Sequence, residues 1–520
     1  IISPGWRIWV KNKFRCFKTY RTLEGYEMIK LMCNVLAVPL LICLLLVSIG
    51  NVSEANTDED DLWNKVPEIL KSIQEPSIPD RDYDITDFGA VGDGETDARP
   101  AILAAIDKAN ADGGGRVVLP EGNWFSEGPI HLKSNIDLHI SDGATLKFSG
   151  DPADYLPVVK TRWEGTELYN HSPLIYANNV HDVAITGKGL IDGNSESVFH
   201  TWTGKQRDDR DTLRQMGNSG VPVEDRIFGE GHYLRPSMIQ FFHAERVLLQ
   251  DYTVTNSPFW INHLVYTDHA IVRNLTVDSH FANNDGVDVD SSRYVLIEDN
   301  TFRTGDDAVV VKSGRDADGR DIGRPSEYVV VRNNDMGGED GMALGSEMSG
   351  DIRYVFVTDN VLRNGSAAFR FKGNEDRGGI VEHIRVRNMG IDSFDRLFWF
   401  QLNYPGELGG GYPPIYRDIL FENITADNVD TVFEAHVLNS QSLQDVLLKN
   451  IEVKNSNTHF IMENVQDLKF DNVLINNNPI VGAAANIKDL VQHYEETGDL
   501  SQQGSHSLKI HLTAVSHYEE

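Results

Sequence analysis

The stretch VLLQDYTV at residues 247–254 decides the fold, because its pattern returns along most of the chain. AIVRNLTV follows at residues 270–277 and VLIEDNTF at residues 295–302. Each copy has a short apolar, largely β-branched run, then Asn or Asp, then another apolar position. Further copies start at Tyr328, Val355, His383, Asp418, Asp445 and Asp467. Spacings of roughly 22 to 35 residues are typical of a solenoid.

The repeats contain short strands and turns, with no helix long enough to connect parallel strands in a βαβ unit. We therefore predict an all-β fold, a right-handed parallel β-helix, over residues 81–480. The polar residues at the aligned turn are expected to stack as side-chain ladders. They are Asp251, Asn274, Asp299, Asn333, Asp359, Asn388, Asn423, Asn450 and Asn472.

Helices are expected near the ends of the β-helix. The Ala-rich segment Ala98–Ala109 predicts a short helix that caps the first coil, since an open end exposes sheet edges. Residues 56–80 are predicted to form a helix at Asp60–Ile73 followed by a linker. Residues 481–520 are predicted to form a C-terminal cap and tail, with a closing helix at Ile487–Glu496.

The N-terminal region has the pattern of a targeting segment. Residues 28–55 fit a secretory signal peptide, with a charged start, an apolar run interrupted by Pro39, and a small-residue site ending at Ala55. Residues 1–27 are an unexplained N-terminal extension. We expect a secreted or periplasmic protein with no stable membrane association after cleavage. The mature chain would lack disulfides, because the cysteines are Cys16, Cys33 and Cys43.

The net charge restricts the partners. A formal charge of −31 disfavours nucleic acid and anionic membranes. An anionic polysaccharide is also repelled, so such a substrate needs a local cluster of Arg and Lys at its site.

Acidic residues crowd one part of the repeat. Asp285 lies one coil before the adjacent pair Asp306 and Asp307, and stacked strands are about 4.8 Å apart, so the three carboxylates can converge. Crowding raises carboxyl pKa values, which is how proteins hold an acid and a base together. For Asp288 and Asp290 we favour a structural role.

Two cations alternate around an aromatic residue further along. Arg370 and Lys372 point to one face of a strand and Phe371 to the other. Two cations side by side suit a sugar that carries a carboxylate, and Arg can bind it through two hydrogen bonds. Lys312 and Arg377 are expected to add to this basic patch, although Lys312 could equally pair with the acids.

Several motifs resemble one enzyme family. DFGAVGDGETD from Asp87 and GGGRVVLPEG from Gly113 resemble the N-terminal cap of pectin-degrading β-helix enzymes, and ITGKGLIDGN from Ile185 is similar to a glycoside hydrolase family 28 signature. Residues 283–285, 305–307 and 370–372 resemble that family's Asn-Thr-Asp, Gly-Asp-Asp and Arg-Ile-Lys elements. RWEGTELYN, GEGHYLRP and NSPFWINHLV resemble its bacterial exo-acting polygalacturonase branch. The resemblance covers roughly residues 77–480.

The resemblance implies inverting hydrolysis of α-1,4-galacturonosidic linkages in a pectic polysaccharide or oligogalacturonide. Asp306 would be the general acid, while Asp285 and Asp307 activate the attacking water. Inverting enzymes hold their carboxyl groups about 6.5–9.5 Å apart. No cofactor or metal is expected. The motifs add as substrate-site candidates Arg162, Glu164, His232, Tyr233, Arg235, Trp260 and His263.

One motif departs from the family. Where many members carry Gly-His-Gly, this chain has Gly-Glu-Asp-Gly at residues 338–341. Either Glu339 or Asp340 takes the histidine position. A carboxylate there indicates a changed subsite, for instance one that faces a neutral sugar or a different arrangement of acids.

Other functions stay open at this point. The long polar stretch Ser195–Gly231 could close one end of the groove, which favours exo action. The same scaffold could serve a hydrolase specific for rhamnogalacturonan or modified pectin, or a non-catalytic carbohydrate-binding β-helix. It could also serve a Ca²⁺-dependent lyase whose oxygen ligands would be Asp285, Asp288, Asp306, Asp307 and Glu339.

Overall fold

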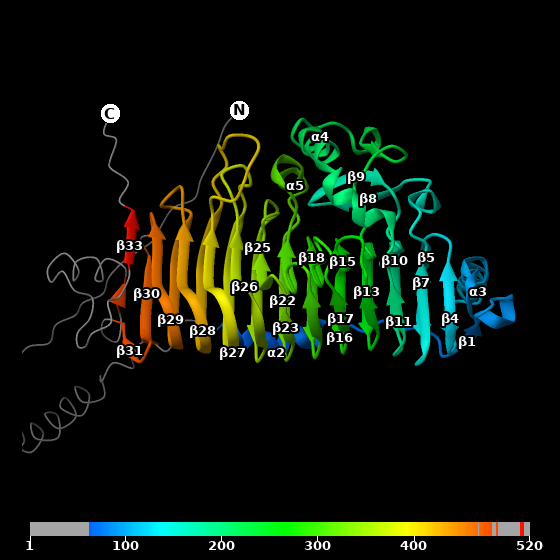
Figure 1. Ribbon diagram of the computed structural model, residues 1–520, viewed down its shortest axis with the longest axis horizontal. Helices are drawn as coiled ribbons and strands as arrows, with labels where there is room; N and C mark the ends of the chain where they lie inside the picture. The colour runs from blue at the N-terminus through cyan, green and yellow to red at the C-terminus, as the bar shows by residue number, and fades with distance from the viewer. Residues whose placement is uncertain (1–61, 466, 481–484, 487–509, 514–520) are drawn as a thin grey trace, which may run out of the picture. The chain divides into compact units, whose positions relative to one another are not determined.

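The computed structural model describes residues 62–465, 467–480, 485–486 and 510–513. The predicted extension, the signal peptide and the closing helix at Ile487–Glu496 lie outside them. Within the described part of the chain, strands stack side by side along one axis (Figure 1). The chain forms a right-handed parallel β-helix, which confirms the predicted fold class.

One column of strands carries the predicted site. Its members pair in parallel and in register from coil to coil. Inward side chains such as Val289, Val311 and Phe371 are buried in the core, and the alternate ones face the other way. The strands are β15 (Asn262–Val265), β18 (Val287–Asp290), β21 (Val309–Lys312), β24 (Asp340–Leu344) and β26 (Val361–Lys372).

Two further columns complete each coil. The first contains β3 (Gly115–Leu119), β6 (Ile136–Ile140), β10 (Ile175–Thr186), β13 (Ile239–Gln250), β16 (Asp268–Arg273), β19 (Arg293–Glu298), β22 (Ser326–Arg332) and β25 (Ile352–Thr358). The second contains β4 (Gly122–Ser126), β7 (Ala144–Phe148), β11 (Leu190–Asp192), β14 (Thr253–Thr255), β17 (Thr276–Ser279), β20 (Thr301–Thr304) and β23 (Asp335–Gly337). In the last coils the strands run on through the bends, as β27 (Ile380–Gln401), β28 (Ile415–His436) and β29 (Leu443–Glu463).

The helices predicted ahead of the repeats are present, whereas α4 (Arg207–Asn218) and α5 (Asp316–Ile322) were not predicted. α3 (Arg99–Ala111) lies at the first coil and confirms the capping helix (Figure 1). A 3₁₀ turn at Leu62–Lys65 leads into α2 (Val66–Ser72). Apolar residues of this segment pack outside the coils, against Ile271, Leu296, Val330 and Phe356.

The predicted turn ladder forms in the later coils. Asn423 donates to Asn388 at 3.3 Å, and Asn450 donates to Asn423 at 3.0 Å. The aligned residues have positive φ, between 52° and 72°, a conformation that Asn and Asp tolerate better than most residues. A second ladder was not predicted: it is buried and joins Asn300, Asn334 and Asn360.

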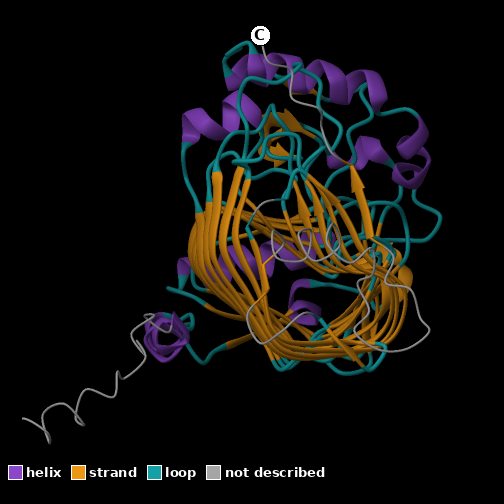
Figure 2. Cartoon of the chain, turned by 90° about the vertical axis from the view of Figure 1, so that its left-hand side faces the viewer, coloured by secondary structure: helices purple, strands orange, loops and turns teal. Residues whose placement is uncertain are grey.

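Insertions gather at one end of the strands. α4 (Arg207–Asn218), α5 (Asp316–Ile322), β8 (Val159–Trp163) and β9 (Thr166–Asn170) lie above the coils in Figure 1, and Figure 2 shows helices and loops over that same side. Among the described helices, none is long and apolar enough to span a membrane.

Candidate active site

Three aspartates occupy one position of the repeat in successive coils. The Gly286 N–H donates to the Asp307 carbonyl at 2.9 Å, and the Ala308 N–H donates to the Asp340 carbonyl at 2.8 Å. These bonds align Asp285 with Asp307 and Asp307 with Asp340. The backbone steps between them are therefore those of stacked strands, about 4.8 Å each.

Asp306 joins two members of this stack. One carboxylate oxygen each of Asp285, Asp306 and Asp307 lies within 4.8 Å of the others, so the three acids converge as the repeat predicts. These nearest oxygens are closer than the about 6.5–9.5 Å that separates the two carboxyl groups in inverting glycosidases. Inversion is thus expected from the resemblance to the family, not from this spacing.

The three converging acids differ in charge state. Burial and the neighbouring Asp307 raise the pKa of Asp306 to about 6. Burial, with the charges of Asp306 and Asp288, raises the pKa of Asp285 well above its usual range. Burial alone would also raise the pKa of Asp307, but Lys372 and Lys312 outweigh it and hold this pKa low. Below about pH 6, a protonated Asp306 carboxyl thus lies beside the ionised Asp307 carboxylate.

Asp340, rather than Glu339, belongs to this cluster. Glu339 is exposed, whereas Asp340 is buried. The Asp340 carboxylate accepts from Arg370 at 2.9 Å and pairs with Lys372 at 3.3 Å. Burial, opposed by Lys372 and reinforced by Asp307, raises the pKa of Asp340 to about 7.

Lys312 balances the acids from the other side. Its ammonium lies 3.3 Å from Glu347 and 3.9 Å from both Asp285 and Asp288, and 4.5 Å from the centre of the Trp260 ring. Asp288 is fully buried, and burial raises its pKa well above the usual range. Lys312 therefore contacts the candidate catalytic acids. Its position fits both predicted roles, which are pairing with these acids and adding a cation to the basic patch.

A cleft of about 250 Å³ opens over these groups. Four of the substrate-site candidates line it, namely Glu164, Trp260, Lys312 and Lys372. Arg370 is not among the lining residues. It instead donates hydrogen bonds to Asp340 and Gln401. The full lining is Glu164, Gln206, Arg210, Arg214, Trp260, Asn283, Asp285, Asp306, Asp307, Lys312, Arg315, Ser346, Glu347, Lys372 and Tyr404.

Other motif residues lie behind the cleft. Arg162 donates to Asp290 at 3.0 Å, and His263 contacts the same carboxylate at 3.4 Å. Gln240 in turn contacts His263 at 2.9 Å. All four side chains are buried, so this group supports the strands beneath the acids rather than lining the cleft.

The remaining predicted residues also stay outside the lining. Arg235 is buried and donates to backbone carbonyls and to Asn283, which lines the cleft. Arg377 is buried against Asp316. The backbone N–H of Tyr233 and the ring of His232 both contact Asp209.

Sequence reasoning missed a group that ties three insertions together. Arg214 of α4 lies 2.6 Å from Glu164, in the turn between β8 and β9, and 2.5 Å from Glu407, in the loop after β27. Arg315 contacts Glu407 at 2.8 Å and Glu347 at 3.1 Å. The polar run TGKQRDDRDTLRQMGNSG was the only signal, and it supplies Gln206, Arg210 and Arg214.

Comparisons with known proteins identify one enzyme family. Residues 227–468 match the model of glycosyl hydrolases family 28, and residues 83–209 match that of rhamnogalacturonase A/epimerase, pectate lyase-like. A hyperthermoactive exopolygalacturonase from Thermotoga maritima is 41% identical, with 82% of this chain and 98% of that chain covered and a TM-score of 0.79.

Two more distant relatives extend the comparison. A probable polygalacturonase from Vitis vinifera is 29% identical over 404 residues, which cover 74% of this chain and 77% of the relative. A family 28 exopolygalacturonase from Yersinia enterocolitica is 21% identical, with 77% of this chain and 76% of that chain covered and a TM-score of 0.64. The latter likeness supports the fold alone.

Proposed function

Since the chain belongs to glycosyl hydrolase family 28, we propose that it is an exo-acting polygalacturonase that hydrolyses α-1,4-galacturonosidic linkages with inversion. One observation carries the chemistry: Asp306, with a pKa raised to about 6, lies beside Asp307, whose pKa is held low by Lys372 and Lys312. An acid and a base are thus present together in one cleft.

The reaction uses the three acids in separate roles. Asp306 donates its proton to the glycosidic oxygen as the bond to the anomeric carbon breaks. Asp307 accepts a proton from the water whose oxygen attacks that carbon from the opposite face. Asp285 starts protonated, because its pKa is raised, and therefore orients this water instead of deprotonating it.

The cleft supplies the cations that a uronate needs. Arg210, Arg214, Lys312, Arg315 and Lys372 all line it, in a chain with a net charge of −31. Each also faces or pairs with a carboxylate, so the cations are held in place before the substrate arrives. A carboxylate-bearing sugar is therefore favoured here over a neutral one.

Exo action is supported by the group that joins α4 to its neighbours. The ion pairs of Arg214 with Glu164 and Glu407 hold residues of three insertions beside the acids. The cleft of about 250 Å³ is smaller than the about 300–1,000 Å³ of common ligand sites, which suits a terminal sugar better than an internal polymer segment. The similarity to an exopolygalacturonase supports the same proposal.

We place the enzyme outside the cytoplasm. Residues 28–55 fit a signal peptide, and the substrate class is a polymer that cells meet in their surroundings. N-terminal sequencing of protein collected from the culture medium tests this: a mature start after Ala55 is expected, and retention of the full chain inside cells contradicts it.

The test of function is a product analysis on polygalacturonate, rhamnogalacturonan and short galacturonides. Monogalacturonate released from chain ends of polygalacturonate, with slow loss of viscosity, is expected. Proton NMR during the first turnovers should show the β-anomer, because inversion of an α-linkage produces it.

The three converging carboxylates could also hold a hard cation, so a chelator control is included. Reducing ends that form equally with and without chelator are expected. An unsaturated, ultraviolet-absorbing product that disappears with chelator identifies a lyase and overturns the proposal. Preferred cleavage of rhamnogalacturonan overturns the substrate assignment alone.

A further inference from the structure

The outward face of the site column continues past the catalytic cleft. Arg370 of β26 pairs in register with Trp399 of β27, and Trp399 pairs with Glu434 of β28. One row across, Lys372 aligns with Gln401. These rows form a floor that leads away from the acids, toward the later coils.

Arg396 occupies the same repeat position as the stacked aspartates. Asp340 aligns with Ala367, and Ala367 aligns with Arg396. Arg396 therefore lies three coils beyond Asp307, about 14 Å along the axis. That distance is beyond the sugar ring held in the catalytic cleft.

The Arg396 guanidinium is held in place, but some of its hydrogen-bond donors have no partner among the described residues. Its Nε donates to Glu434 at 2.7 Å, and the group lies 4.2 Å from the centre of the Trp399 ring. Arg370 lies over the same ring at 4.0 Å. The other two nitrogens of Arg396 make no hydrogen bond to a described residue, and its side chain is 28% exposed. A guanidinium held in place in this way can bind a carboxylate through two parallel hydrogen bonds.

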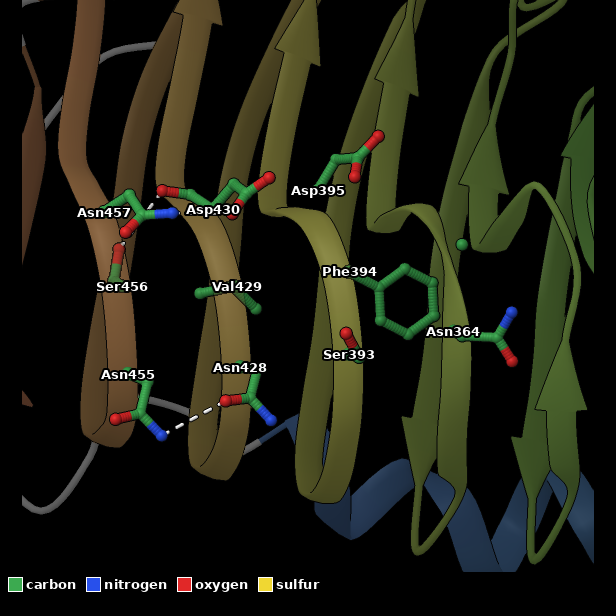
Figure 3. Close-up of a pocket in the computed structure, with 11 residues that line it drawn as sticks. Asn364, Ser393, Phe394, Asp395, Asn428, Val429, Asp430, Asn455, Ser456 and Asn457 are labelled. Carbon is green, nitrogen blue, oxygen red and sulfur yellow. Dashed lines mark hydrogen bonds between the residues drawn. The ribbon is translucent and has the colours of Figure 1, made fainter.

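The neighbouring hollow is a poor path for an anionic chain. Figure 3 shows this hollow of about 500 Å³ at the bends of the late strands, with Asp395 and Asp430 on its upper edge. By strand register, both occupy the repeat position of Asp306. Its lining includes no Lys or Arg, and consists of Asn364, Gly365, Ser393, Phe394, Asp395, Asn428, Val429, Asp430, Asn455, Ser456 and Asn457. A polyuronate is repelled from it.

We propose that Arg396 is a distal carboxylate-binding site for a uronate of the polymer chain that extends out of the catalytic cleft. This inference rests on the proposed function, because it assumes a polyuronate substrate. The floor beyond Arg396 turns acidic at Glu434 and Glu463, with His436 between them. Arg396 is thus the last cation on this path among the described residues. Sugars beyond it make no further contact with a cation, so substrate binding stops improving with oligomer length.

The test compares Arg396→Gln with wild type on purified galacturonides from two to eight sugars long. In wild type, kcat/KM rises with length and then reaches a plateau. In Arg396→Gln, the ratio of kcat/KM on the hexamer to that on the dimer falls about tenfold, through KM, which is the effect of losing one charge-assisted contact. Arg396→Lys keeps the charge and recovers most of this ratio.

The matched control is Arg417→Gln, because Arg417 pairs with Glu382 on another column of the β-helix. Its length dependence should equal that of wild type, and melting curves should show all three variants folded. An unchanged hexamer-to-dimer ratio in Arg396→Gln overturns the inference while leaving the proposed function intact. Failure of wild type to cleave any galacturonide removes the proposed function, and the inference falls with it.

Discussion

Asp307 and Asp340 hold the same position in successive coils, and one ammonium group serves both carboxylates. Lys372 Nζ lies 2.7 Å from Asp307 and 3.3 Å from Asp340. Because Asp307 receives two contacts from this ammonium, it is the carboxylate that remains ionised. The pKa of Asp340 is raised to about 7, so its carboxyl stays protonated at lower pH.

Asp306→Asn should remove turnover without removing binding. The amide cannot donate a proton as the carboxyl does, so kcat should fall by about 10²- to 10⁴-fold. Initial rates on polygalacturonate and calorimetric titration with a galacturonide measure the two effects. Asp395→Asn is the matched control, because it changes the same repeat position three coils away. Turnover retained by Asp306→Asn contradicts the assignment of the acid.

The sequence predicts that the acids converge, because the repeat gives the position of each acid within its coil. Asp285, Asp306 and Asp307 converge through simple stacking. Alternation along a strand does not tell which face looks into the cleft, and His263, a substrate-site candidate, lies behind the cleft with Asp290. Contacts between insertions are harder still: Arg214 and Glu407 are 193 residues apart and meet only in the folded chain.

The pH profile should fall on its alkaline side from about pH 6. Asp306 must be protonated to act, and burial places its pKa at about 6, so kcat/KM decreases as pH rises through that value. The acid limb reflects protonation of Asp307, whose pKa is lowered. Rates measured from pH 3 to 9 check this, and an alkaline limb that begins above pH 8 would count against Asp306 as the acid.

Asp340→Asn should flatten the pH dependence of stability. The folded pKa of about 7 lies above the ordinary value of 3.8, so the stability present below about pH 4 is lost as pH rises through 7. Three pKa units correspond to about 4 kcal/mol. Urea unfolding of both proteins at pH 4 and pH 7.5 measures the difference, and parallel losses in the two proteins contradict the prediction.

Arg214→Ala should loosen the proposed restriction to chain ends. It removes both ion pairs that connect α4 to Glu164 and Glu407, so internal segments of the polymer gain access. The ratio of oligomers to monogalacturonate among early products should rise several-fold, with a faster drop in viscosity. Arg332→Ala, which breaks the ion pair with Glu298 elsewhere on the β-helix, provides the control. An unchanged product profile in Arg214→Ala assigns exo action to other parts of the cleft.

The stacking of Asp285, Asp307 and Asp340 on consecutive coils fixes the spacing of side chains along the axis of the β-helix. The distance from the acids to any later group, Arg396 included, can change only by whole coils, in steps of about 4.8 Å. Gain or loss of one coil after β24 would lengthen or shorten the reach along the polymer by one step while the reacting groups stay in place. Substrate length and chemistry are therefore separately adjustable in this architecture.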